Sequence, residues 1–249
     1  MMKEWIKSKA EELLAKEYYC TLEDLNQKRR VYTINPAASQ PYLKIMTYKN
    51  CIAVCTSEDL HEKIQELLQD KCRDEIFELP FVYGQTIHYL PDSTFTDEKR
   101  PAPQWTCTYF TDQEISSLQG LEGFENALAF EKDGSTPTKA VYIAEDQKGI
   151  IGAAGAAKSS VPGLWEIGVE VSEEYRNAGL GTHLVKGLTR ELLSRGIVPF
   201  YSASVTNLGS QMVAARCGYI PAWVDTYGTI LDGSSIYEEY VKDMSARFL

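Results

Sequence analysis

The stretch from Val169 to Gly181, VEVSEEYRNAGLG, constrains the fold of this chain more than any other. An alternating apolar run that ends at Val171 predicts a strand, and the leucines spaced by four from Leu180 to Leu192 predict a helix. The loop between them contains two glycines, Gly179 and Gly181, which let a backbone approach a ligand closely. A helix N-terminus offers unpaired N–H groups and positive potential to an anion. We therefore predict that this loop binds phosphate.

Three kinds of glycine loop compete for this stretch. A Walker P-loop requires Gly-Lys-Ser/Thr, and no such string follows a suitable glycine. A dinucleotide fingerprint requires a third glycine where this chain has Leu184. A tight strand–helix turn that binds no ligand remains an alternative. Motifs elsewhere in the sequence must show which kind of loop this is.

Composition limits the partners of the chain. The 249 residues carry a net charge of −10, which disfavours a nucleic-acid partner and favours a cationic substrate such as an amine. No apolar run reaches the roughly 18 residues of a membrane span, and charges interrupt the N-terminal helix pattern. We therefore expect a cytoplasmic protein with no membrane partner. The six cysteines form no set with histidine pairs, so reduced thiols and no metal site are expected.

The polar, proline-containing stretch 91–104 predicts a boundary between an N-terminal α/β region, 1–104, and a second domain, 105–249. Before the boundary we expect helices at 3–17 and 57–69, with Ser57 as the N-cap, and strands at 43–48, 51–55 and 86–90. After it we expect strands at 105–110, 140–144, 149–158, 164–171, 197–205 and 222–231, and helices at 112–118, 179–195 and 207–217. Residues 237–248 suit either a helix or an edge strand. The fold class is α/β (α+β), with a mixed central sheet flanked by helices.

Three blocks in order resemble the GNAT superfamily of acyl-CoA-dependent N-acyltransferases. Arg176 to Gly181 resembles its pyrophosphate loop, and Val169-Glu170-Val171 resembles the strand before that loop. Downstream, the segment 207–219, with Asn207, Ser210 and Gly218-Tyr219, resembles the following strand–helix pair. The resemblance covers roughly 105–235. A fainter resemblance, carried by Glu166 to Val171 and by 196–199, is to the zwittermicin-resistance type of acetyltransferase.

The resemblance implies acetyl-CoA as co-substrate. It implies that backbone groups of Val169 and Val171 contact the thioester carbonyl and the pantetheine arm, and that Asn207 and Ser210 lie near the thiol. The residues that it places around the pyrophosphate are Arg176, Asn177, Ala178, Gly179, Leu180, Gly181 and Thr182.

Catalytic residues are harder to predict. The family often carries a base at positions that are Trp165 and Ile167 here, and a general-acid tyrosine where this chain has Ala214. Glu170 and Glu166 are the remaining carboxylates on this strand, and alternation places both on the face opposite those apolar side chains. A buried glutamate beside apolar neighbours suits a general base, so Glu170 and then Glu166 are the candidates. The alternative is that both are solvated or salt-bridged strand residues. Tyr201 and Tyr219 are expected to pack rather than to donate protons.

The leading functional prediction is acetyl transfer to a primary amine of a small molecule, with an antibiotic as one candidate. A non-catalytic acyl-CoA-binding or regulatory module is the first alternative, and a protein or peptide N-acetyltransferase is the second. The oligomeric state stays open, with a homodimer among the alternatives.

Overall fold

The computed structural model describes residues 3–92, 95 and 105–230. The chain divides into two compact units, one formed by residues 1–10 and 89–221 and the other by residues 11–88 and 222–249. Three elements, α1 (Glu4–Glu17), β4 (Thr86–Pro91) and β10 (Tyr219–Asp225), contribute residues to both units. The predicted division at residues 104 and 105 stays a prediction, and most of the predicted boundary stretch 91–104 lies outside the described residues.

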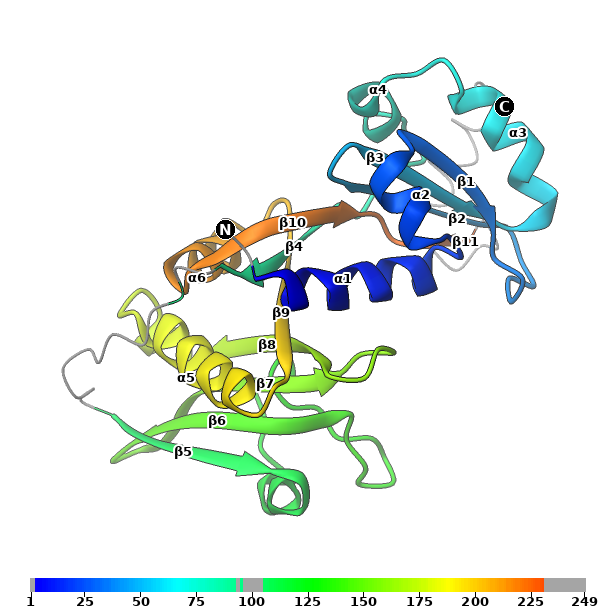
Figure 1. Ribbon diagram of the computed structural model, residues 1–249. Helices are drawn as coiled ribbons and strands as arrows, with labels where there is room; N and C mark the ends of the chain where they lie inside the picture. The colour runs from blue at the N-terminus through cyan, green and yellow to red at the C-terminus, as the bar shows by residue number, and fades with distance from the viewer. Residues whose placement is uncertain (1–2, 93–94, 96–104, 231–249) are drawn as a thin grey trace. The chain divides into compact units, whose positions relative to one another are not determined.

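The unit of residues 89–221 is built on a mixed sheet with strand order β9-β8-β7-β6-β5 (Figure 1). Neighbouring strands are antiparallel except β8 and β9, which are parallel. The strands are β5 (Thr106–Thr111), β6 (Thr138–Asp146), β7 (Gly149–Lys158), β8 (Leu164–Val171) and β9 (Val198–Ser204). Its helices are η1 (Asp112–Leu118) and η2 (Glu173–Tyr175), both 3₁₀, and α5 (Leu180–Ser194) and α6 (Leu208–Arg216).

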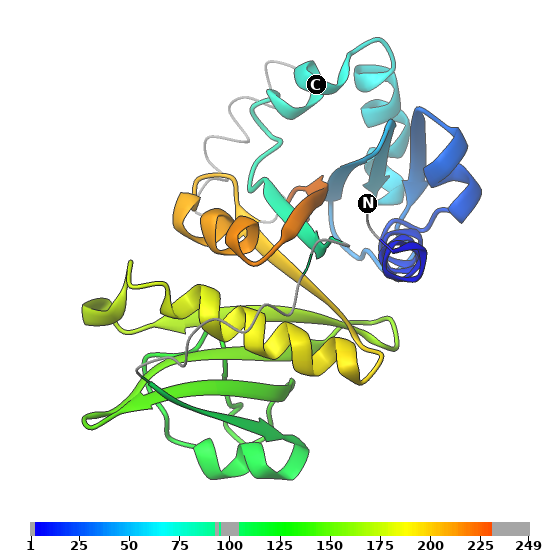
Figure 2. The same cartoon turned by 60° about the vertical axis from the view of Figure 1, so that its left-hand side comes forward.

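Helix α5 packs along one face of this sheet, against β6 to β9 (Figure 2). Its apolar stripe, which includes Leu184, Leu188 and Leu192, is fully buried, as expected for an amphipathic helix that covers a sheet. The opposite face carries a second core made by η1, the following loop and the strands. That core contains Ile115, Phe124, Ala127, Leu128, Val141, Ile143 and Ala153.

Two glycines paired across β7 and β8 let the backbone of the 126–127 loop lie directly on the sheet. Gly155 and Gly168 are register partners. A Cβ on Gly155 would lie 1.6 Å from the carbonyl oxygen of Ala127, and a Cβ on Gly168 would lie 1.7 Å from that of Asn126. No side chain fits at either position without moving backbone. These glycines therefore fix the height of the loop above the sheet.

The second unit contains a sheet with the order β1-β3-β2-β10, in which β1 and β3 are parallel. Its core packs α3 and α4 against β2 and β3 through Leu43, Ile45, Ile52, Val54, Ile64, Leu68, Ile76, Phe81 and Val82. The strands are β1 (Arg30–Ile34), β2 (Tyr42–Tyr48), β3 (Cys51–Thr56), β10 (Tyr219–Asp225) and β11 (Thr229–Ile230). The helices are α2 (Leu22–Gln27), α3 (Glu58–Leu68) and α4 (Arg73–Phe77), with the second half of α1.

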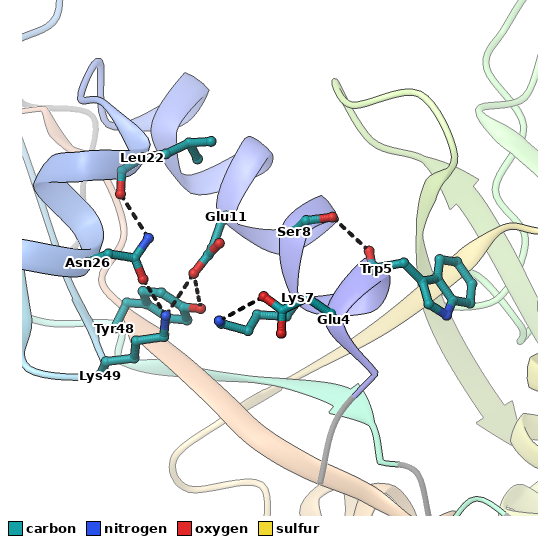
Figure 3. Close-up of polar contacts among 9 residues, drawn as sticks. All are labelled: Glu4, Trp5, Lys7, Ser8, Glu11, Leu22, Asn26, Tyr48 and Lys49. Atoms are coloured by element: carbon teal, nitrogen blue, oxygen red, sulfur yellow. Dashed lines mark hydrogen bonds and ion pairs between the residues drawn. The ribbon is translucent and has the colours of Figure 1, made fainter.

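A buried carboxylate on α1 holds the turn between β2 and β3 (Figure 3). Glu11 accepts hydrogen bonds from the Tyr48 hydroxyl and the Lys49 ammonium, each at 2.8 Å. Lys49 also contacts the side-chain oxygen of Asn26 on α2. Because two hydrogen bonds satisfy this buried carboxylate, one of which is also an ion pair, the turn residue Lys49 has a defined position.

Most predicted elements are present, with two corrections. Ser57 precedes α3, but its hydroxyl accepts from the backbone N–H of Tyr42 at 3.0 Å and makes no cap bond. The strand predicted at 222–231 starts earlier, at Tyr219, and is interrupted after Asp225 before β11. The short elements α2, β1 and α4 were not predicted, and residues 237–248 lie outside the described residues. In the described part, no helix is both long and apolar enough to cross a membrane.

Candidate active site

The site forms where β8 and β9 separate. Their parallel pairing ends at Ile167 and Tyr201, although β8 continues to Val171 and β9 to Ser204. A cavity of about 420 Å³ opens at this point, a volume that suits a small-molecule ligand. It is lined from β6 to β9, the start of α6, the loop at 125–129 and Pro137. The lining residues are Glu125, Asn126, Ala127, Ala129, Pro137, Thr138, Gly155, Ala157, Glu166, Ile167, Gly168, Val169, Tyr201, Ser202, Ala203, Ser204, Asn207 and Ser210.

The backbone of β8 presents polar groups to the gap. Ser172 donates its N–H to Ile151 on β7, and hydrogen-bonded pairs alternate along an antiparallel ladder. Residues 166, 168 and 170 therefore bond to β7, while Val169 and Val171 direct their N–H and C=O groups toward β9. Because β9 has diverged there, the amide of Val169 faces the cavity that Val169 lines.

The loop before α5 has the backbone that an anion site requires. Asn177 and Gly179 have positive φ values of 63° and 85°, and a Cβ added to Gly179 would meet nothing within 4 Å. Gly179 occupies the N-cap, and no side chain caps the helix. The first N–H groups of α5 consequently lack an intrahelical partner. The Nε of Arg176 donates to the Val171 carbonyl at 3.2 Å, which ties the guanidinium to the end of β8.

The remaining predicted cofactor residues divide into exposed and buried side chains. Ala178 is exposed, whereas Leu180 and Thr182 are buried and can offer only backbone groups to a ligand. Asn207 is the N-cap of α6, and its side-chain oxygen accepts from the Ser210 N–H at 3.0 Å. The Ser210 hydroxyl lies 2.6 Å from the hydroxyl of Tyr201. Asn207 and Ser210 thus lie together at the cavity.

The two candidate carboxylates have different surroundings. The register of β8 against β7 is continuous, so Glu166, Gly168 and Glu170 share one face. Glu170 accepts hydrogen bonds from the backbone N–H and side-chain amide of Asn126, at 3.1 and 3.0 Å. Glu166 lines the cavity and accepts from the Ser202 hydroxyl at 2.5 Å. Neither carboxylate is buried, and the contacts of Glu170 with Asn126 hold the 126–127 loop.

Sequence reasoning missed part of the site. Tyr201, expected to pack, is 2% exposed but lines the cavity, and burial raises the pKa of its hydroxyl above the ordinary value. Tyr219 does pack, because its buried hydroxyl lies 2.8 Å from that of Thr189. Ser202 and Glu125 also line the cavity, and hydrogen bonding from the Gly123 N–H lowers the pKa of Glu125. The serine–tyrosine-rich strand 201–204 carried no motif that could have signalled this role.

Residues 100–219 match the family model described as the Acetyltransferase (GNAT) family. No curated protein matches this chain. Among solved structures, a GNAT-family acetyltransferase from Novosphingobium aromaticivorans shares 17% identity, covering 57% of this chain and 63% of its own, with a TM-score of 0.43.

Another from Colwellia psychrerythraea shares 11% identity, covering 91% of this chain and 74% of its own, with a TM-score of 0.48. The aminoglycoside N-acetyltransferase AAC(6')-Iy, solved in complex with CoA, shares 20% identity, covering 47% of this chain and 92% of its own, with a TM-score of 0.34. The chain therefore spans less than two thirds of the length of the first of these structures.

Proposed function

Because residues 100–219 belong to the GNAT family of acetyltransferases, we propose that this protein transfers an acetyl group from acetyl-CoA to a primary amine of a small molecule. The observation that carries this proposal is the cavity at the point where β8 and β9 part, with a backbone amide and a carboxylate on its wall. A carboxylate beside a backbone donor suits a reaction in which an ammonium loses its proton while negative charge develops on oxygen.

The chain has groups that fit acetyl-CoA. The open glycine turn and the uncapped N-terminus of α5 suit its pyrophosphate, and Arg176 adds a guanidinium beside them. Bound acetyl-CoA supplies the acetyl group as an activated thioester. The amide of Val169 is the donor best directed to stabilise oxyanion charge in the gap.

Glu166 is the general base in this proposal. It lines the cavity, whereas the carboxylate of Glu170 is engaged by Asn126. The Ser202 hydroxyl, which donates to Glu166, fixes the orientation of the carboxylate. Glu125 adds a second negative charge to the cavity wall, so the site attracts an acceptor in its ammonium form before Glu166 removes the proton.

Tyr201 is the proton donor for the leaving thiolate in this proposal, replacing the tyrosine that the family often carries at the position of the buried Ala214. The hydroxyl is protonated at neutral pH, because the ordinary pKa of tyrosine is about 10 and burial raises the pKa of Tyr201 above it. We predict that Tyr201→Phe lowers kcat with little change in the KM for acetyl-CoA, measured by thiol release. Tyr219→Phe, which removes another buried, hydrogen-bonded hydroxyl, is the control. Equal kcat losses in both variants would assign Tyr201 a packing role.

Isothermal titration with acetyl-CoA and CoA tests the cofactor, and thiol release with a panel of small amines, including amino-sugar antibiotics, tests the reaction. Absence of binding at millimolar concentration would refute the proposal. Binding without turnover on any amine would favour the non-catalytic acyl-CoA-binding module, an alternative that Ala214 supports. Turnover only with peptides would favour a peptide acetyltransferase.

A further inference from the structure

A second cavity, of about 480 Å³, lies wholly within the unit of residues 11–88 and 222–249. It forms where the start of β1, the β2–β3 turn, the end of α3 and the start of α4 meet. Its lining residues are Arg29, Arg30, Asn50, Ile52, Gln69, Cys72 and Arg73. Three are arginines, and none of these lining residues carries a carboxylate. This concentration of positive charge occurs in a chain whose net charge is −10.

The backbone around the cavity holds these arginines in place. Arg30 caps the end of α3: its guanidinium donates to the carbonyls of Leu68, at 2.6 Å, and Gln69, at 2.5 Å, and also contacts that of Lys71. Arg73 donates to the Lys49 carbonyl at 3.0 Å, on the turn that Glu11 secures. Arg30 and Arg73 are thus positioned before any ligand arrives.

Arg29 contributes an exposed positive charge to the cavity wall. Its carbonyl accepts from the Ile52 N–H at 2.9 Å, which fixes its backbone at the entrance to β1. No contact of its guanidinium is found within the described part of the chain, and its side chain is exposed. Each guanidinium has five N–H donors, so Arg29 and Arg73 together keep most of theirs for a ligand.

We propose that this cavity binds a small phosphate-bearing anion, such as inorganic phosphate, pyrophosphate or a phosphate ester. Guanidinium forks match the oxygens of a phosphate, which has enough acceptors and charge to engage more than one arginine. The amides of Asn50 and Gln69 add neutral donors on the same wall. The site is separate from the proposed acetyl-transfer cavity and does not rest on that function.

Isothermal titration of the full chain with phosphate and pyrophosphate, at constant ionic strength, tests the site. The double variant Arg29→Ala/Arg73→Ala is expected to raise the Kd by at least about tenfold, and Arg30 is left intact because it caps α3. The control Lys63→Ala/Lys132→Ala removes the same charge from exposed positions outside the cavity and should keep the original Kd. Equal Kd values in the two double variants, or no binding at millimolar phosphate, would overturn the proposal. Titrations with AMP, a phosphate ester, and with malonate, a dicarboxylate, show whether the cavity prefers either class of anion to free phosphate.

Two readouts separate this site from the α5 loop. Gly179→Asp should abolish binding of pyrophosphate at that loop and leave the arginine cavity able to bind it.

Cys72 lines the cavity and is exposed, so bound phosphate should slow its alkylation by iodoacetamide, measured by peptide mass spectrometry. Cys107, in the other unit, is the internal reference. An unchanged Cys72 rate at saturating phosphate would place the anion elsewhere and refute the assignment.

Discussion

At the scale of single residues, hydrogen-bond partners separate side chains that look equivalent in the sequence. Glu166 and Glu170 share one face of β8, but only Glu166 lines the cavity. The Glu170 carboxylate is bound to the backbone and side chain of Asn126. A carboxylate engaged in this way positions a loop, and a carboxylate on a cavity wall is accessible to a substrate.

We predict that Glu166→Gln lowers kcat for amine acetylation by about 100-fold or more, since it removes the proposed base. The KM for acetyl-CoA should change little. Glu170→Gln is the matched control, because its amide oxygen still accepts from Asn126, and its kcat should fall much less. Steady-state kinetics measured by thiol release test this prediction. A larger loss of kcat in Glu170→Gln than in Glu166→Gln would make Glu170 the base.

Gly168→Ala tests whether backbone contact fixes the 126 loop. The new Cβ would lie 1.7 Å from the Asn126 carbonyl oxygen, so the loop must move, at a cost of about 1–3 kcal/mol. We expect a lower Tm and a higher KM for the acceptor. Gly209→Ala is the control: its Cβ meets only the Asn207 side-chain oxygen, at 3.7 Å, and alanine favours a helix. A Tm for Gly168→Ala that matches wild type would contradict this description of the loop.

At the scale of elements, α5 combines two roles. Its buried leucines hold it on the sheet, and its N-terminus lies open at Gly179. Gly179 and Gly196 flank the helix with similar backbones, φ 85° and 71°, and a Cβ at either position would meet nothing within 4 Å. Backbone strain therefore affects the two positions alike, whereas the positive potential at the N-terminus of α5 favours an anion only at Gly179.

We predict that Gly179→Asp raises the KM for acetyl-CoA by at least about tenfold, because a carboxylate would occupy the anion position at the N-terminus of α5. Gly196→Asp should leave this KM near its original value, although it should lose more stability because its carboxylate lies at the negative end of the helix dipole. Kinetics and thermal unfolding of both variants provide the test. Equal KM values for acetyl-CoA in the two variants would show that the loop does not bind the cofactor.

At the scale of the whole molecule, net charge affects how substrates approach. A chain with a charge of −10 attracts cationic acceptors over a distance that salt shortens to about 10 Å at 0.1 M. We predict that the KM of a diamine or polyamine acceptor rises with ionic strength more steeply than that of a monoamine. Initial rates from low to high NaCl measure this dependence, and a KM that does not change with salt for either acceptor would exclude electrostatic attraction.

The sequence alone predicted a resemblance to the GNAT family, whose model residues 100–219 match, and it predicted most of the elements. Helical and strand periodicity depend on neighbouring residues, so β8, the glycine loop after it and α5 were predictable from 164–195 alone. Phosphate binding by that loop stays a prediction. The sequence also predicted Asn207 and Ser210, which lie at the cavity. Short elements such as α2 and α4 were missed because they span too few residues to show a period.

Tertiary structure alone decided which side chains meet. The engagement of Glu170 by Asn126 joins residues that are 44 apart in sequence, and the cavity role of Tyr201 depends on where β9 leaves β8. The three arginines of the second cavity come together only when β1, the β2–β3 turn and α4 converge. A local pattern contains no information about such long-range contacts, because they depend on how the elements pack.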